Sequence, residues 1–210
     1  MPRPHDTPAG PNPDVRDVRV EVLSDAWYTL RRATFQHRQA DGTWIEEQRE
    51  AYDRGNGVAA LLRDPERGTV LLVRQYRLPA HLNDHPDGML LEVPAGLIDD
   101  GEDAEEALRR EIEEEVGHRV DDLTLVHRLY MSPGAVTEHL SLFSGTYGHR
   151  TWIGAGGGAD DEDEDIDVVE VPLADTRAMV ADGRICDAKT VLLLQHAWLD
   201  EVEQPPGPDR

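Results

Sequence analysis

Residues 96 to 117 constrain this chain more than any other stretch. From Asp103 to Val116, apolar residues recur with the three- and four-residue spacing of one helix face. Glu111 and Glu115 fall inside that apolar stripe, where burying two like charges four residues apart would be costly. A cation between the two carboxylates would remove this cost. Mg2+ fits best, because it takes hard carboxylate oxygens and completes its octahedron with water and substrate phosphates.

The ends of this helix are also predicted by the sequence. Asp103 is a favourable N-cap, and Glu106 follows it three residues later in a variant of the capping box. Gly117 can adopt the left-handed conformation that ends a helix. We therefore expect a helix over Asp103–Val116. Taken alone, this segment leaves one alternative open, a solvated helix with intrahelical Glu–Arg ion pairs.

Composition and charge limit the class of protein. The chain has 210 residues, which suits one domain, or one domain with a small appendage. A formal net charge of -22, from 21 basic and 43 acidic side chains, argues against nucleic acid or an anionic membrane surface as the main partner. No apolar run approaches the roughly 20 residues of a membrane span. The N-terminus lacks a signal-peptide core, and cytoplasmic residence is expected. The single Cys186 excludes an intramolecular disulfide, and no Cys/His constellation supports a catalytic thiol.

The order of strand and helix patterns predicts a mixed α/β fold with a mixed sheet between helices. We expect a disordered tail over 1–14, an N-terminal antiparallel sheet over 15–55, a main domain over 56–202 and a second tail over 203–210. A small sheet is marginal alone, so one of its faces needs cover, which a second copy could supply. The expected strands are residues 18–23, 27–36, 44–52, 58–63, 70–76, 89–93, 124–130, 139–147 and 167–172, and the further expected helices are 174–181 and 190–199.

The pattern Gly-x5-Glu-x7-Arg-Glu-aliphatic-x-Glu-Glu-x-Gly resembles the Nudix box. The positions that match it are Gly96, Glu102, Arg110, Glu111, Ile112, Glu114, Glu115 and Gly117. One position departs, because His118 stands where an aliphatic residue is usual. The departure is expected to weaken a packing contact after the helix but to leave every expected metal ligand in place.

The resemblance covers about residues 18 to 199 and is to the GDP-mannose pyrophosphatase branch of the Nudix hydrolases, whose near relatives are ADP-ribose pyrophosphatases. It implies an α/β/α sandwich and a homodimer with a swapped N-terminal sheet, in which one subunit helps build the nucleotide site of the other. The segments that carry the resemblance are 24–27, 49–57, 74–77, 130–134, 156–166 and 187–190.

The same resemblance implies the metal site. Glu111 and Glu115 would hold Mg2+, for which Mn2+ could substitute, together with the backbone carbonyl of Ala95. Glu114 would bind a second ion or orient water. Arg110 would be structural and would pair with a box carboxylate. Gly96 would permit a close approach of the backbone.

The general base is implied to come from the acidic loop. Aligning Glu164-Asp165-Ile166 with the matching tripeptide of the family selects Glu164 as base and metal ligand. This loop carries what looks like a two-residue acidic insertion, so Glu162 is a rival. The preceding glycine run would let the loop close over substrate. The acid run alone would instead indicate a solvated, mobile loop.

Substrate contacts are also carried over from the family. Trp27 would come from the partner subunit and stack on the base, although a Trp at a strand start can equally be packed in a core. Arg77 and Lys189 would supply positive charge for phosphate, and the alternative for each is a surface charge. The other implied contacts are Gln48, Arg49 and Glu50 of the partner, Ala95, Gly96 and Leu97 of the box strand, and Glu138 for the sugar or a ligand water.

The expected function is Mg2+-dependent hydrolysis of the diphosphate of a nucleotide sugar, with GDP-mannose first and ADP-ribose as the alternative. Ser132-Pro133-Gly134 resembles a marker of ADP-ribose hydrolysis but also occurs in the GDP-mannose branch, so it does not decide between them. Two other classes stay open: a catalytically silent nucleotide-binding module, and an acid-rich Ca2+ binder over residues 160 to 165. The latter lacks the ligand spacing of an EF-hand. A zinc site from His81, His85 and His139 matches no compact ligand pattern.

Overall fold

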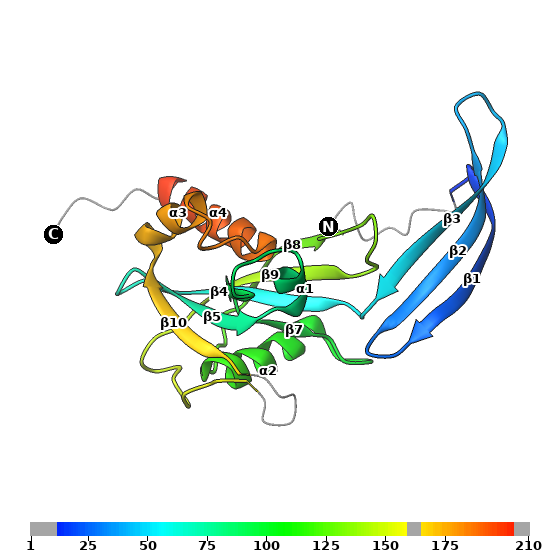
Figure 1. Cartoon of the computed structure of the whole chain (residues 1–210). Coiled ribbons are helices and arrows are strands. Elements are labelled where there is room, and N and C mark those ends of the chain that lie inside the picture. Colours follow the sequence, from blue (N-terminus) through cyan, green and yellow to red (C-terminus); the bar gives the residue numbers. More distant parts are fainter. Residues whose placement is uncertain (1–11, 159–164, 204–210) are drawn as a thin grey trace. The chain divides into compact units, whose positions relative to one another are not determined.

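The structure is a computed structural model that describes residues 12–158 and 165–203, with side chains described up to residue 200 (Figure 1). Glu162 and Glu164 therefore lie outside the described residues. The chain divides into two compact units. The first comprises the described residues up to Arg54 together with Ser132–Glu138, and the second comprises Gly55–Met131 and the chain from His139 onward.

The first unit is a three-stranded antiparallel sheet in the order β1-β2-β3. Its strands are β1 (Val15–Asp25), β2 (Thr29–Arg38) and β3 (Trp44–Asp53), each close to a predicted strand. Residues 132–138 belong to this unit because they hydrogen bond to the end of β3. The Tyr52 N–H donates to the Ala135 carbonyl at 2.8 Å, and the Thr137 N–H donates to the Tyr52 carbonyl at 3.1 Å.

One feature of β1 is an exposed apolar row. Val18, Val20 and Val22 alternate along the strand and are each more than half exposed. Alternate residues of a strand share one face, so these three valines form an apolar row that no described residue of this chain buries. The row agrees with the expectation that the small sheet needs cover from elsewhere.

The second unit contains a mixed sheet in the order β10-β5-β4-β9-β8, with β6 also paired to β5 and β7 also paired to β4. The β4–β9 pair is parallel and the other pairs are antiparallel. The strands are β4 (Gly57–Asp64), β5 (Thr69–Tyr76), β6 (Met89–Glu92), β7 (Ala95–Leu97), β8 (Thr124–Tyr130), β9 (His139–Thr146) and β10 (Asp167–Pro172).

Helices cover both faces of this sheet (Figure 1). Val58, Ala60 and Leu62 of β4 pack in the core cluster under α2 (Ala104–Val116). Ala59 and Leu61 pack in the cluster under α3 (Leu173–Ala181) and α4 (Ala188–Glu203). The predicted α/β/α sandwich with a mixed sheet is thereby confirmed. In the part of the chain that the structure describes, no helix is long and apolar enough to span a membrane.

Two short elements were not predicted. Helix α1 (Leu78–Leu82) has five residues, none of them buried, so it carries no apolar periodicity. Strand β7 has only three residues and follows Pro94 directly, which makes it too short for an alternating pattern. Strand β7 matters for function, because it brings the backbone of Ala95 and Gly96 beneath α2.

Candidate active site

Helix α2 begins and ends where its sequence predicts. Asp103 is the N-cap, and its Oδ1 accepts from the Glu105 N–H at 2.8 Å. Gly117 ends the helix with a φ of 68°. Glu111 and Glu115 are only 8% and 1% exposed, so the two acids of the apolar stripe are buried. A fully solvated helix is therefore the wrong interpretation for this face.

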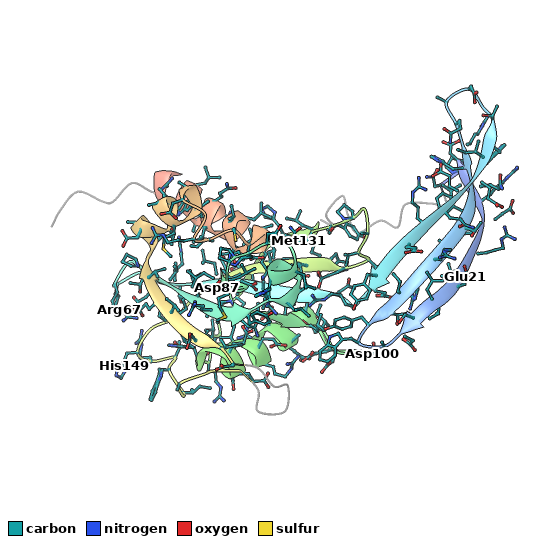
Figure 2. All side chains as sticks on the ribbon, in the orientation of Figure 1. Glu21, Arg67, Asp87, Asp100, Met131 and His149 are labelled. Carbon is teal, nitrogen blue, oxygen red and sulfur yellow. The ribbon has the colours of Figure 1, made fainter. Side chains whose placement is uncertain are left out.

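Both buried acids converge on the backbone of β7. Oε2 of Glu115 accepts from the Ala95 N–H at 2.9 Å. A Cβ at Gly96 would overlap the carboxyl group of Glu111, so only glycine allows that carboxylate to lie against the strand. The Ala95–Gly96 peptide is thus held beneath two carboxylates, and Figure 2 shows side chains filling the space between α2 and the sheet.

Arg110 connects the remaining box carboxylates. Its Nη1 lies 2.9 Å from Oε1 of Glu111 and 3.2 Å from Oε2 of Glu114. Its Nη2 donates to Oε2 of Glu102 and to the carbonyl of Leu97, both at 3.3 Å. Burial lowers the pKa of Arg110, but the hydrogen bonds that Arg110 donates to Glu102 and the charge of Glu111 outweigh burial and raise the pKa above its usual value. This arginine therefore stays charged and offsets part of the negative charge of α2.

The donors on α2 and β7 suit a hard divalent cation. Glu111 and Glu115 provide carboxylate oxygens next to the backbone of Ala95, which matches the oxygen ligands that Mg2+ prefers. Because a carboxylate can accept at several positions, the bond from Ala95 to Glu115 is compatible with a metal contact. Among the described residues, no group of three or more His, Cys, Asp or Glu is arranged to hold a metal ion. The remaining implied ligand, Glu164, lies outside those residues.

Arg77 and Lys189 meet at a buried acid that the sequence analysis missed. Glu92, the last residue of β6, is 2% exposed. Arg77 donates from Nε to Oε1 of Glu92 at 3.1 Å and from Nη2 to Oε2 at 2.8 Å. Nζ of Lys189 lies 2.7 Å from Oε2 of Glu92 and 3.1 Å from Oδ2 of Asp187. Because Lys189 is itself only 9% exposed, it is not a surface charge.

This cluster is formally neutral, since two carboxylates balance two cations. Burial would raise the pKa of Glu92, but the Lys189 ammonium and the Arg77 guanidinium outweigh burial and lower that pKa to about 2. Glu92 is therefore ionised across the physiological range. The sequence does contain a sign of the role of Glu92. This acid lies inside the apolar run Met89–Val93, and an acid in a buried run needs a cation nearby.

The glycine run after β9 is anchored to the last turn of α2. The N–H groups of Gly157 and Gly158 donate to the carbonyls of Glu115 and Glu114 at 3.0 and 3.2 Å. A Cβ at Gly156 would overlap the backbone of Glu115. The N–H of Ile166 in turn donates to the Gly157 carbonyl at 3.3 Å. Hydrogen bonds thus join the two flanks of segment 159–164, while closure over substrate stays a prediction.

His118 occupies the box position that is usually aliphatic. Its side chain is buried, Nδ1 lies 2.8 Å from Oγ1 of Thr151, and its ring packs edge-on against Tyr147 with a centroid distance of 5.3 Å. His118 thus has an aromatic contact and a hydrogen bond of its own, and the expected weakening of packing relative to an aliphatic residue stays a prediction. Burial, helped by the charge of Arg67, lowers the pKa of His118.

The residues implied to contact substrate from the N-terminal sheet lie in the first unit. Trp27 is 83% exposed and contacts the Tyr28 ring edge-on. Core packing is therefore the wrong interpretation for Trp27 within the described chain. An exposed indole at a hairpin tip is available to stack on a base.

The other implied substrate contacts of this unit have polar neighbours. Arg49 on β3 donates to the Gln48 carbonyl at 2.8 Å. Glu50 accepts from Arg32 at 2.9 Å. Glu138 forms an ion pair with Arg54 at 3.3 Å.

Comparison with known proteins decides the family. The NUDIX domain model matches residues 53–194, and the model of the GDP-mannose pyrophosphatase NudK N-terminal domain matches residues 14–52. The chain belongs to the NUDIX family. The predicted membership of the Nudix hydrolases is thereby confirmed, and helix α2 is the helical part of the Nudix box.

Two similar proteins are named GDP-mannose pyrophosphatase, and a solved structure with the same fold is named ADP compounds hydrolase. The GDP-mannose pyrophosphatase of Yersinia enterocolitica serotype O:8 / biotype 1B is 45% identical over 185 residues, which are 88% of this chain and 95% of that protein. The GDP-mannose pyrophosphatase of Pectobacterium atrosepticum is 44% identical over 180 residues, which are 86% of this chain and 92% of that protein. A crystal structure of an ADP compounds hydrolase shares the Nudix fold, with a TM-score of 0.68, 23% identity and coverage of 90% of this chain and 96% of that one.

Proposed function

We propose that this Nudix hydrolase cuts the diphosphate of a nucleotide sugar in a Mg2+-dependent reaction, with GDP-mannose giving GMP and mannose 1-phosphate. The observation that carries the proposal is the convergence of Glu111 and Glu115 on the Ala95–Gly96 backbone. Arg110 offsets part of the charge of these buried acids, and carboxylate oxygens beside a backbone peptide are the kind of ligand that a hard divalent cation takes. The names of the relatives that share 44–45% identity support the substrate.

Glu111, Glu115, the Ala95 carbonyl and Glu164 would hold the metal. A bound Mg2+ would supply positive charge that neutralises the phosphate oxygens. Glu164 would accept a proton from the water whose oxygen attacks phosphorus. The bond between that phosphorus and the oxygen that bridges the two phosphates then breaks, and the bridging oxygen remains on the phosphate that leaves. Glu114 would orient that water or bind a second ion.

Arg77 and Lys189 would contact the phosphates as directional donors. Because Glu92 and Asp187 balance their charge, the contribution to binding comes from well-placed N–H groups more than from net positive charge. Backbone groups of Gly96 and Leu97 would line the same site. Glu138 would bind the sugar or a ligand water.

We also propose a homodimer in which Trp27 and the Gln48-Arg49-Glu50 segment act in the site of the partner. The exposed valine row of β1 supports a self-complementary contact. Val20→Lys is expected to give monomers in sedimentation experiments. Glu21→Lys, its neighbour on the opposite face of the strand, is the matched control and is expected to stay dimeric. A dimeric Val20→Lys variant would contradict the interface.

Mixing two weak variants tests whether Trp27 acts across the dimer. In a hybrid of Trp27→Ala with Glu115→Gln, one site would combine an intact box from the first subunit with an intact Trp27 from the second. Activity of the mixture should therefore exceed that of either variant after subunit exchange. No gain in hybrids verified by mass spectrometry would mean that Trp27 serves its own subunit or none.

The substrate is tested by phosphate analysis of a panel: GDP-mannose, ADP-ribose, ADP-glucose and NADH, each with Mg2+ and with a chelator. GDP-mannose should have the highest kcat/KM, and Glu115→Gln should abolish the metal-dependent rate. A higher kcat/KM for ADP-ribose would overturn the proposed substrate but not the proposed hydrolysis of a diphosphate. A wild type without metal-dependent hydrolysis of any of the four would favour a silent nucleotide-binding module.

A further inference from the structure

The first turn of α4 is hydrogen bonded to the segment that leads from β6 into the Nudix box. Oγ1 of Thr190 accepts from the N–H of Val93 at 2.8 Å. Both groups are fully buried, with 0% exposure of Thr190 and of Val93. The contact joins residues 97 positions apart in the sequence, so it fixes the place of β6 relative to α4.

The Thr190 hydroxyl is itself fixed. It donates to Oδ2 of Asp187 at 2.6 Å, and the Thr190 N–H donates to the same oxygen at 3.0 Å. With its proton committed to Asp187, the hydroxyl presents a lone pair to Val93. Lys189, from the same turn, adds an ion pair to Glu92, the residue before Val93.

Only one residue separates Val93 from Ala95. That residue is Pro94, whose ring fixes its φ and whose carbonyl accepts from the Ala60 N–H at 3.0 Å. The N–H of Ala95 donates to Glu115 at 2.9 Å. Three successive residues are therefore hydrogen bonded to α4, β4 and α2 in turn. Because few backbone torsions between Val93 and Ala95 are free to change, a displacement of Val93 would also displace Ala95.

We propose that Thr190 is a positioning residue for the metal site, acting through the Val93 N–H to hold the Ala95 carbonyl in place beside Glu111 and Glu115. The inference rests on the proposed function in one respect, the contact between that carbonyl and the metal. Thr190 would touch neither metal nor substrate. Loss of such an indirect support typically weakens metal affinity by about 10- to 100-fold.

The test is Mn2+ binding without substrate, measured by electron paramagnetic resonance on the full-length chain. Thr190→Val keeps the shape of the side chain but removes the acceptor, so the dissociation constant should rise at least about tenfold. Thr190→Ser keeps the hydroxyl and should stay within about twofold of wild type. Thr190→Cys has a weak acceptor, so its dissociation constant should lie between those of the valine and serine variants. If the valine variant does not fold, the cysteine variant still tests the proposal.

Thr176→Val is the matched control. Thr176 is also fully buried, donates to the Leu173 carbonyl at 2.6 Å and accepts from Nε1 of Trp198 at 3.1 Å. This variant should lose thermal stability but keep wild-type Mn2+ affinity. Equal loss of affinity in both valine variants, or unchanged affinity in Thr190→Val with a lowered Tm, would make Thr190 a purely structural residue.

Failure of the inference is distinguishable from failure of the proposed function. Wild type that binds Mn2+ but cuts no nucleotide sugar would overturn the proposed substrate and leave the positioning role intact. Wild type that is active, with a Thr190→Val variant of unchanged Mn2+ affinity, would overturn only the positioning role. Wild type that binds no Mn2+ would overturn both.

Discussion

The buried acid Glu92 offers the sharpest prediction about stability. Glu92→Gln keeps the shape of the side chain but removes the negative charge that Arg77 and Lys189 share. Two cations would then lie close together without their common partner. Lys189 would keep its ion pair with Asp187, but Arg77 would lose two charge-assisted hydrogen bonds and Lys189 one, and removing one member of a buried ion pair is destabilising.

The magnitude follows from the shift in pKa. The pKa of Glu92 is about 2 in the folded chain, against an ordinary value of 4.5. Since one pKa unit corresponds to about 1.4 kcal/mol, the ionised form contributes about 3 kcal/mol to the free energy of unfolding at neutral pH. The side chain is only 3% exposed, so solvent screening removes little of this amount. Because the folded pKa is depressed, the contribution is complete above pH 4.5 and is lost as pH falls toward 2.

Urea unfolding of wild type and Glu92→Gln tests this value. At about pH 7 the variant should be less stable by about 3 kcal/mol, and the gap between the two proteins should narrow once pH falls below about 4.5. Glu113→Gln is the matched control, because Glu113 pairs with Arg119 at 2.7 Å at an exposed site; exposed pairs contribute little. A gap below about 1 kcal/mol at neutral pH, or one that stays constant in acid, would refute the reasoning.

Three further predictions concern the box and its surroundings. Gly96→Ala should lower kcat by about 100-fold, since its Cβ displaces a box carboxylate; Gly154→Ala, which has open space around its Cβ, should not, and steady-state kinetics compare the two. Glu164→Gln should lower turnover strongly while Glu162→Gln does not; equal, mild losses would contradict the choice of base. His118 has a lowered folded pKa, so wild type should lose stability as pH falls below 6.5 while His118→Gln is spared that loss. Thermal melts of wild type and His118→Gln above and below this pH test the prediction. Tm values that change with pH in the same way in both proteins would contradict it.

The sequence predicted the parts of the fold whose signals are local. Helix α2 follows from its cap, its apolar stripe and Gly117, and the acids within the stripe indicate a cation without reference to any family. The strands β8 and β10 have the predicted bounds, because each is a run rich in β-favouring residues. These signals are carried by neighbouring residues, so no knowledge of the tertiary structure was needed.

The parts that could not be predicted depend on contacts between distant residues. Glu92 and Lys189 are 97 positions apart, and their pairing turned two expected phosphate cations into members of a neutral cluster. The glycine run was expected to let the acidic loop close over substrate, which stays a prediction, and its hydrogen bonds to the carbonyl end of α2 were not expected. Neither contact leaves a local periodicity, because each arises only when sheet and helices are assembled.

The hydrogen bond between Ile166 and Gly157 bears on how this family can vary. With the two flanks joined, the chain between them can change in length at little cost, since closure entropy grows only with the logarithm of loop length. Two added residues cost about 0.3 kcal/mol by this relation. Insertion or deletion of acids in this stretch is therefore expected to leave the helix and the sheet unchanged, and under the proposed role of Glu164 it would change which acid is the metal ligand.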